Sequence, residues 1–413
     1  MERIAKLMAD AAPLHAPHDI IDSALETVRR HLRMEVAYLS EFVGDEVVFR
    51  AVSAPGLEDL VKPGDTRSVD QVYCRHIIAG DLPRLIRDTA DHSFAQTMPI
   101  TTQLPIGSHV SVPIRRDDGS IYGMFCCLSP RPNPTLNDRD LEVMELFAEL
   151  SSRQVNRSLL DRARRGTIEA STRDMIDEGL FRVVYQPIVN LATGETVGFE
   201  SLCRFPGEPY RSPDIWFAEA AEGGLGEELE IAVAARALIA LPLLPEPLYL
   251  SVNCAPETLA SGAISRLLSG CDQSRVVVEI TEHASVADYD AMLKELALLH
   301  DRGVRIAIDD AGAGYSGLQH ILRLKPDIIK LDMALTRSID TDYARRSLAE
   351  ALSGFARETG AKLIAEGIET RGEADTLREI GVALGQGFLL GRPDTLGAAL
   401  GRLTVAPAAR LLA

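Results

Sequence analysis

The chain has 413 residues, 46% of them hydrophobic, and its 60 acidic and 43 basic side chains give a net charge of −17. This length suits two or three domains with large buried cores. The acidic balance excludes a protein that coats nucleic acid, because no basic stripe exists to neutralise phosphates. A small phosphate-bearing substrate remains compatible with it, since bound metal ions can reverse the local field.

Neither a membrane span nor an export signal is expected. No apolar run approaches the roughly 20 residues that a transmembrane helix needs. Residues 1–13 carry charges inside any apolar stretch and do not have the pattern of a signal peptide. The six cysteines show no CxxC spacing, and most of them lie in apolar, strand-like stretches. We therefore expect reduced, buried cysteines in a cytoplasmic protein.

Residues 1–150 predict an α+β domain with an antiparallel sheet. Residues 19–32 are amphipathic at helical spacing. Strand-like alternation follows at 36–42 and 46–54. A second strand pair, 108–129, turns around an Asp-Asp-Gly-Ser sequence, which is a strong hairpin signal.

This order of elements, with the SVPI strand at 111–114 and the strand at 121–129, resembles the GAF family. GAF domains are small-molecule sensors and dimerisation modules. The resemblance therefore implies an unknown small-molecule or protein signal and a homodimer. Some sensors of this type attach a linear tetrapyrrole through a cysteine near a histidine. Cys74 and His76 leave pigment or haem binding open, with ordinary packing of both side chains as the alternative.

A long helix is predicted over residues 136–180, beginning at Asn137 or Asp138. A series of side chains at a/d-like spacing runs along it, interrupted by Ser151. The series fits a signalling helix that pairs with its twin in a dimer. It fits equally the last helix of the first domain followed by a linker. We assign residues 151–175 to this helical linker and residues 176–413 to a second domain.

From residue 180 onward, apolar runs of strand length recur with helical stretches between several of them. Such alternation predicts a parallel sheet covered on both faces. Eight strands over about 230 residues fit a TIM-like (β/α)8 barrel. A doubly wound open sheet is the alternative, although no GxGxxG loop follows any strand. The predicted strands are 183–189, 197–205, 248–253, 276–281, 304–311, 328–332, 362–369 and 384–390.

Polar side chains stand at or near the ends of these strands. The chemistry of a barrel lies at the carboxyl ends of its strands, which meet at one mouth. Carboxylates together with an amide oxygen form an all-oxygen set that selects hard cations such as Mg²⁺ or Mn²⁺. No histidine or cysteine pair shows zinc spacing. The strand-end residues are Glu200, Asn253, Glu279, Asp309, Asp310, Lys330, Glu366 and Gln386.

Two adjacent acids, Asp309 and Asp310, end an apolar run and precede a glycine-rich turn. Unpaired buried carboxylates cost several kcal/mol each. A pair of divalent cations about 3.5–4 Å apart would compensate them. The alternative is a strand that ends in an Asx-turn with both acids solvated. Lys330 would orient water or balance transition-state charge, or would form a structural salt bridge with one of the acids.

Seven motifs follow one another in a fixed order between residues 170 and 404. They are Glu200-Ser201-Leu202 with Arg204, SVNCAP with Asn253, EITE with Glu279 and Glu282, DDAGAGYSG with Asp309 and Asp310, IIKLD with Lys330, EGIE with Glu366 and Glu369, and GQGF with Gln386. This set resembles the EAL family of cyclic-di-GMP phosphodiesterases. The resemblance covers more than half of the chain and implies hydrolysis of cyclic di-GMP to linear 5′-pGpG.

The resemblance also implies a role for each matched position. Water held between two Mg²⁺ or Mn²⁺ ions would attack phosphorus in line, and the 3′ oxygen would leave. The implied metal ligands are Glu200, Asn253, Glu279, Asp309 (bridging both ions), Asp310 and Glu366. The implied catalytic residues are Lys330, which would hold the attacking water, Glu366, as base or ligand, and Asp310. The implied substrate contacts are Gln186, Arg204, Gln386 and Pro393 (in a turn with Arg392), and the implied loop-bracing acids are Glu282 and Glu369.

Two positions depart from the family pattern. Ser201 stands where alanine is usual, a change of one hydroxyl beside a metal ligand that we expect to be tolerated. Ala311 stands where phenylalanine is usual, which removes an anchor for the loop after it. The main alternative is therefore a cyclic-di-GMP receptor that binds but hardly cleaves. Another phosphodiester or a sugar phosphate is a third possibility, and no GGDEF-like motif indicates a second, cyclase activity.

Overall fold

A computed structural model describes residues 17–207, 209–281, 289–311 and 322–403. The side chain of Asp310 lies outside the described part, although its backbone belongs to a described strand. Contacts divide the chain into two units, Met1–Arg164 and Arg165–Ala413. The domain boundaries that we assigned from the sequence stay predictions. In the described part, no helix combines the length and the apolar character that crossing a membrane would require.

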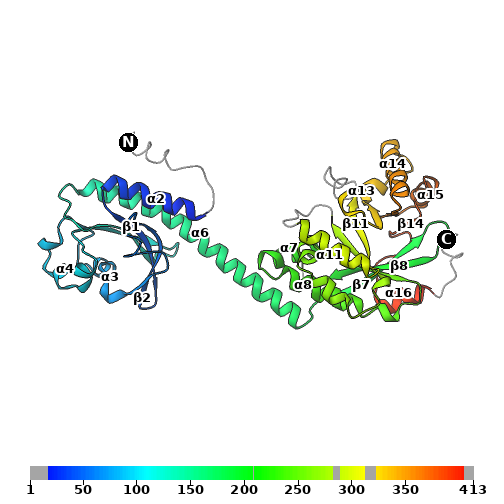
Figure 1. Cartoon of the computed structure of the whole chain (residues 1–413), viewed down its shortest axis with the longest axis horizontal. Coiled ribbons are helices and arrows are strands. Elements are labelled where there is room, and N and C mark those ends of the chain that lie inside the picture. The colour runs from blue at the N-terminus through cyan, green and yellow to red at the C-terminus, as the bar shows by residue number, and fades with distance from the viewer. Residues whose placement is uncertain (1–16, 208, 282–288, 312–321, 404–413) are drawn as a thin grey trace. The chain divides into compact units, whose positions relative to one another are not determined.

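The first unit is built on a six-stranded antiparallel sheet in the order β3-β2-β1-β6-β5-β4 (Figure 1). Both predicted hairpins are present, as the pairs β1–β2 and β5–β6. The strands are β1 Val36–Val43, β2 Glu46–Ser53, β3 Thr66–Ser68, β4 Leu85–Ile86, β5 Ser108–Arg115 and β6 Ile121–Ser129. The helices are α2 Pro17–Leu32, α3 Tyr73–Ala79, α4 Ser93–Thr97, α5 Pro99–Gln103 and α6 Asp138–Asp177, with 3₁₀ turns η1 Val69–Gln71 and η2 Thr89–Asp91.

Alternate side chains of this sheet enter two separate cores, as the period of two in a strand requires. On one face, residues such as Leu39 and Phe125 pack with α2 and with the first half of α6. On the other face, Tyr38 and Met124 pack with α3 and α5. The antiparallel sheet with its helices confirms the α+β prediction. The predicted long helix is confirmed as α6, which begins at Asp138.

The cysteines are free, and all except the half-buried Cys271 are buried. Cys74 lies in the core between the sheet and α3, 3.9 Å from the Tyr38 hydroxyl and 4.0 Å from Cys126 Sγ. His76 instead contacts Asp81, with Nδ1 3.1 Å from Oδ2. The two side chains considered for pigment attachment therefore have different surroundings, and Cys74 is packed as an ordinary core residue.

Gly123 on β6 is required by the close approach of β1. A methyl group at Gly123 would lie 1.7 Å from the carbonyl oxygen of Ser40, next to an irregularity in the β1–β2 register. We expect Gly123→Ala to destabilise the first unit by about 3 kcal/mol, because overpacking against backbone cannot relax easily. Gly166→Ala is the control, since Gly166 lies in α6 with open space around it. Alanine should stabilise that helix by up to about 1 kcal/mol. Scanning calorimetry that gave both variants the same shift would contradict the prediction.

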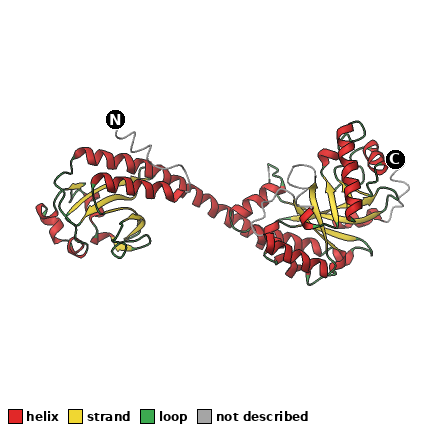
Figure 2. Cartoon of the chain, turned by 45° about the horizontal axis from the view of Figure 1, so that its top comes forward, coloured by secondary structure: helices red, strands yellow, loops and turns green. Residues whose placement is uncertain are grey.

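The second unit has a central sheet with helices around it (Figure 2). The sheet is a closed eight-stranded barrel in the order β10-β11-β12-β13-β14-β7-β8-β9. The strands are β7 Arg182–Asn190, β8 Thr196–Arg204, β9 Tyr249–Asn253, β10 Val276–Thr281, β11 Arg305–Ala311, β12 Ile328–Leu331, β13 Lys362–Ala365 and β14 Leu384–Gly385. The helices are α7 Pro213–Glu222, α8 Gly226–Leu238, α9 Pro256–Ala260, α10 Ala263–Leu268, α11 Tyr289–Asp301, α13 Met333–Thr336, α14 Tyr343–Thr359, α15 Arg371–Glu379 and α16 Leu396–Leu403, with 3₁₀ turns η3 Leu241–Leu243 and η4 Gln273–Arg275. The predicted TIM-like barrel is confirmed.

The direction of the first barrel strand was predicted wrongly. Strands β8 to β14 run parallel to one another, but β7 is antiparallel to both β8 and β14. The physical reason is the connection after β7, residues 191–195, which contains Gly194 at φ +75°. So short a turn makes a hairpin, whereas a parallel crossover needs a dozen or more residues. The last two strands are also shorter than predicted, ending at Ala365 and Gly385.

Candidate active site

The lower part of the barrel interior is an apolar layer with one contribution from each strand. Tyr249 fills the space in front of Gly198, where a methyl group would lie 2.8 Å from the tyrosine ring. The glycine is therefore the contribution of β8. The other members are Ile188, Tyr249, Val277, Ala307, Ile328, Ile364 and Leu384. This layer closes the barrel below the polar residues.

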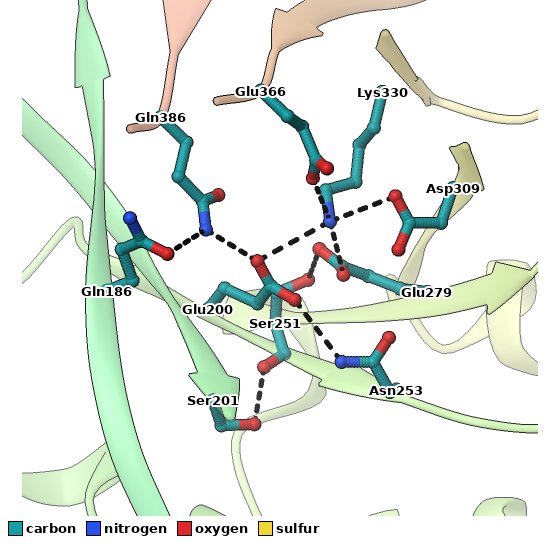
Figure 3. A network of polar contacts seen from close by, with 10 residues as sticks. All are labelled: Gln186, Glu200, Ser201, Ser251, Asn253, Glu279, Asp309, Lys330, Glu366 and Gln386. Carbon is teal, nitrogen blue, oxygen red and sulfur yellow. Dashed lines mark hydrogen bonds and ion pairs between the residues drawn. The ribbon is translucent and has the colours of Figure 1, made fainter. Parts of the chain in front are cut away.

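A polar layer lies above the apolar layer, on the same inward face, and each of its residues is two positions away from the apolar residue of the same strand. Successive inward side chains in a strand are two residues apart, so each parallel strand adds its polar residue on the carboxyl side of its apolar one. Strand β7 runs the other way, and its polar residue accordingly precedes Ile188. The polar layer consists of Gln186, Glu200, Ser251, Glu279, Asp309, Lys330, Glu366 and Gln386 (Figure 3). Most of the predicted site residues are therefore brought together.

Lys330 is the centre of this layer. Its side chain is buried, and Nζ lies 2.5 Å from Glu366 Oε1 and 2.7 Å from Glu279 Oε2. Asp309 Oδ1 at 3.2 Å and Glu200 Oε2 at 3.5 Å complete four carboxylates around one ammonium group. Lys330 was predicted either to lie among the acids or to form a salt bridge with one of them. The structure shows both, and Lys330 pairs with four acids rather than one.

The cluster changes the proton affinity of its members. Burial would by itself lower the pKa of Lys330, but Asp309, Glu200, Glu279 and Glu366 together raise it well above its ordinary value. Burial raises the pKa of Glu366 to about 8, although the nearby ammonium opposes this shift. Burial and the charge of Glu200 also raise the pKa of Glu279 well above its ordinary range. One ammonium group is insufficient to compensate four largely buried carboxylates, so the site favours additional positive charge.

Glu200 is oriented by side-chain amides. Gln386 Nε2 donates to Glu200 Oε2 at 2.6 Å and to Gln186 Oε1 at 2.9 Å. Asn253 Nδ2 donates to Glu200 Oε1 at 3.3 Å, so its own Oδ1 is turned away from this carboxylate (Figure 3). Oε1 of Gln386 is buried and has no hydrogen-bond partner among the described residues. A buried carbonyl oxygen without a partner favours a donor or a cation beside it.

Ser251 is a member of the polar layer that was not predicted from the sequence. Its Oγ donates to Glu279 Oε1 at 2.5 Å, and its carbonyl accepts a 2.7 Å hydrogen bond from the hydroxyl of Ser201. The signal was available, because Ser251 lies two residues before Asn253 and so faces the same side of β9. Glu230 of α8 was missed as well, and it accepts a 3.1 Å hydrogen bond from the amide of Ala255 just after that strand.

We expect Ser251→Ala to weaken binding of a divalent cation to these acids. Removal of the hydroxyl leaves Glu279 Oε1 without its donor, and loss of such an orienting partner costs 10–100-fold in metal affinity, on the order seen at other metal sites. The measurement is the affinity of the full chain for Mn²⁺, by titration calorimetry. Ser269→Ala, at an exposed serine of the same unit, is the control. An unchanged affinity for Mn²⁺ in Ser251→Ala would show that Ser251 does not position Glu279.

The predicted substrate contacts lie around this layer. Gln186 Nε2 donates to the carbonyl of Gly391 at 3.1 Å, which links β7 to the turn that contains Pro393. Arg392 in that turn stacks over Phe388, 4.0 Å from its ring centre. Arg204 is half-buried and lines a pocket of about 320 Å³ together with Asn253 and Glu230. The structure therefore puts these side chains at one end of the barrel, and their contacts with a substrate stay predictions.

Three further predictions concern the acids Asp310, Glu282 and Glu369. Glu282 and the side chain of Asp310 lie outside the described part, as does the loop 312–321. Glu369 forms an ion pair with Arg337 at 2.9 Å, and its predicted role in bracing that loop stays a prediction. Ala311 is buried in the core between barrel and helices, 1% exposed, and pairs with Leu331 of β12.

The donor chemistry of the mouth suits hard divalent cations. The side chains that converge there carry carboxylate and amide oxygens, without a sulfur or imidazole ligand among those described. Within the described residues, no three histidine, cysteine or acidic side chains are arranged as a metal-ligand group. Lys330 Nζ instead occupies the position between the carboxylates. The oxygen-only set and the unpartnered Gln386 Oε1 both fit a bound cation.

Comparisons with known proteins agree with this geometry. The EAL domain family model matches residues 169–393, more than half of the chain, and the GAF domain model matches residues 16–155. An uncharacterized signaling protein of Caulobacter vibrioides is 30% identical over 341 residues, which cover 80% of this chain and 41% of that protein. The cyclic di-GMP phosphodiesterase NbdA of Pseudomonas aeruginosa is 31% identical over 256 residues, which cover 59% of this chain and 33% of that protein. The chain thus spans less than half the length of these curated relatives.

A solved structure is similar to the barrel. The structure described as PaMucR phosphodiesterase in complex with c-di-GMP is 27% identical to this chain, with a TM-score of 0.50. The alignment covers 56% of this chain and 99% of that one.

Proposed function

Because the chain belongs to the EAL domain family and carries a GAF domain, we propose that its barrel hydrolyses cyclic di-GMP to linear 5′-pGpG. The observation that carries this proposal is the convergence of four carboxylates on Lys330 at one end of the barrel. Phosphodiester hydrolysis requires compensation of charge on the phosphate and a positioned water. NbdA, which is named a cyclic di-GMP phosphodiesterase, and the phosphodiesterase structure described as a c-di-GMP complex support the substrate assignment.

We assign two divalent cations, Mg²⁺ or Mn²⁺, to acids of the polar layer together with Asn253 and Asp310. Glu200, Asn253, Glu279 and Asp309 would hold one ion, and Asp309 with Asp310 and Glu366 would hold the other. When bound, such ions lower the pKa of water and neutralise charge on the phosphate. Asn253 would have to rotate to present Oδ1, since its amide nitrogen now faces Glu200.

The chain's own residues would perform the remaining tasks. Lys330 would hold the attacking water and offset the charge that develops on the phosphate oxygens. Glu366, the carboxylate nearest to Lys330 Nζ, would act as a base or as a ligand. Arg204 would contact a phosphate, for which its planar group with five donors is suited. Gln186, Gln386 and Pro393 would contact the dinucleotide.

The proposal also includes regulation by the first unit. Residues 1–150 would sense a small-molecule or protein signal, residues 151–175 would connect the two domains, and residues 176–413 would form the catalytic domain. The homodimer rests on the family resemblance alone, because Met144, Ala148 and Val155 of the a/d-like series on α6 are buried in the core of the first unit. Full-length and 176–413 proteins compared in one turnover assay would reveal regulation as a difference in rate.

The test of the proposed function is turnover of cyclic di-GMP by the full chain with Mg²⁺, Mn²⁺ or EDTA, with products separated by chromatography. We expect pGpG to form only when a divalent cation is present. Binding of cyclic di-GMP without product, for the full chain and for residues 176–413 alike, would identify a receptor instead. Turnover of a different phosphodiester or sugar phosphate, without turnover of cyclic di-GMP, would overturn the substrate assignment.

A further inference from the structure

A pocket of about 110 Å³ lies in the first unit, on the face of the sheet that packs against α3 and α5. Its walls come from β1, β2, β5 and β6 and from the segments that cover this face. Among the described residues, the lining contains no Asp, Glu, Lys or Arg side chain. The walls include the side chains of Tyr38, Phe49, Tyr73, Leu104 and His109.

His109 is the unusual member of this lining. It lies on β5, is 1% exposed, and neither Nδ1 nor Nε2 has a hydrogen-bond partner among the described residues. Tyr73 meets it edge-on, with ring centres 5.2 Å apart, but the Tyr73 hydroxyl is engaged with Thr101 Oγ1 at 2.7 Å. A buried donor or acceptor that lacks a partner costs about 1–3 kcal/mol. Two such atoms on one side chain that lines a pocket indicate that the pocket has an occupant.

The protonation state of His109 limits the chemistry of that occupant. Burial lowers the pKa of His109 to about 3, so the imidazole is neutral at physiological pH. A neutral imidazole offers one N–H donor and one acceptor nitrogen. It would therefore match a hydroxyl or similar neutral group, which can both donate and accept. An anion would find no compensating charge on the described walls.

Size limits the occupant further. An apolar cavity of about 150 Å³ holds a single benzene ring. The pocket at His109, about 110 Å³, is therefore suited to one ring or a short branched chain. A cyclic mononucleotide is larger than this and carries a phosphate that the uncharged walls do not neutralise.

We propose that this pocket is a binding site for a small, uncharged, largely apolar molecule, about one aromatic ring in size, whose hydroxyl or similar group hydrogen-bonds to His109. The apolar walls supply most of the affinity through burial, and His109 supplies selectivity for molecules that carry the polar group. The site is independent of the chemistry in the barrel. It rests on the sensing role proposed for the first unit and names the chemistry of what that unit binds, so it stands or falls separately from the proposed hydrolysis.

The test compares phenol with toluene, which have similar shapes and differ in the hydroxyl group. Binding to the full chain is measured by calorimetry and by ligand-observed NMR, for the native sequence and for His109→Phe, which keeps a ring but has no ring nitrogen. We expect phenol to lose about tenfold in affinity relative to toluene in His109→Phe, the equivalent of one hydrogen bond. Leu104→Trp, which narrows the pocket, should weaken both probes.

Two outcomes would overturn the proposal. One is that neither probe binds the native chain, which would mean that the pocket holds only water. The other is that the ratio of the two affinities is the same with and without the imidazole. Displacement of phenol by cyclic AMP would overturn the assignment to uncharged ligands. If His109→Phe fails to fold, ¹⁵N-histidine NMR of the native chain replaces it, since phenol must then shift the ring nitrogen signals of His109 and toluene must not.

Discussion

Replacement of Glu200 by glutamine is expected to lower turnover of cyclic di-GMP by roughly 10³-fold while leaving the fold intact. Glutamine has nearly the same shape, but it removes one negative charge from the layer that is proposed to hold the cations. It also presents an amide nitrogen to one of the two donors, Gln386 and Asn253, that now face the carboxylate. Turnover with saturating Mn²⁺ is the measurement.

The matched control for this substitution is Glu195→Gln. Glu195 is an exposed glutamate just before β8, far along the same strand from the mouth. The same chemical change there should leave turnover within about twofold. Trp216, the single tryptophan of the chain, lies in the barrel unit and packs on Phe205, so its fluorescence reports whether that unit is folded. A folded Glu200→Gln protein with full activity would contradict the metal assignment.

Replacement of Lys330 by methionine is expected to destabilise the barrel as well as to abolish turnover. Four carboxylates would lose their shared cation, and removal of one partner from a buried ion pair costs about 3–5 kcal/mol. For a unit of this size, that corresponds to a fall of about 10 °C in the unfolding midpoint. Unfolding followed by Trp216 fluorescence in EDTA is the measurement.

Divalent cations should separate the two roles of Lys330. Ions that bind the native state stabilise it, and the variant without the ammonium group has more uncompensated negative charge to attract them. Excess Mg²⁺ should therefore raise the midpoint of Lys330→Met by more than that of the native protein, without restoring turnover. Lys362→Met, at an exposed lysine that begins β13, should change neither property. Equal responses to Mg²⁺ in both proteins would refute the idea that cations share the acids with Lys330.

The sequence was sufficient to predict much of the candidate site, because strand periodicity and strand ends are local features. Glu279 and Lys330 each end a short apolar run, and parallel strands bring such ends to one mouth. Ser251 was missed, because we considered only the last polar residue of its strand. The same rule of alternation that identifies Asn253 also identifies Ser251 two residues before it.

Other features depend on distances that no single stretch encodes. That Lys330 contacts four acids at once follows from closure of the barrel, which brings β8 and β12 close to each other. The sequence likewise does not predict that the ring nitrogens of His109 lack hydrogen-bond partners among the described residues, because it shows only a histidine in an apolar strand. The antiparallel orientation of β7 could have been predicted from the sequence, since the five residues after it are too few for a crossover.

The reversed strand determines where the long helix joins the barrel. Because β7 runs opposite to the other strands, its first residue, Arg182, pairs with Arg204, the last residue of β8. Only residues 178–181 separate it from the end of α6. The helix is thus coupled to the rim where the acids converge, and not to the closed floor of the barrel. The path from α6 to the site is therefore short: β7 carries Gln186, and Gln386 donates to both Gln186 and Glu200.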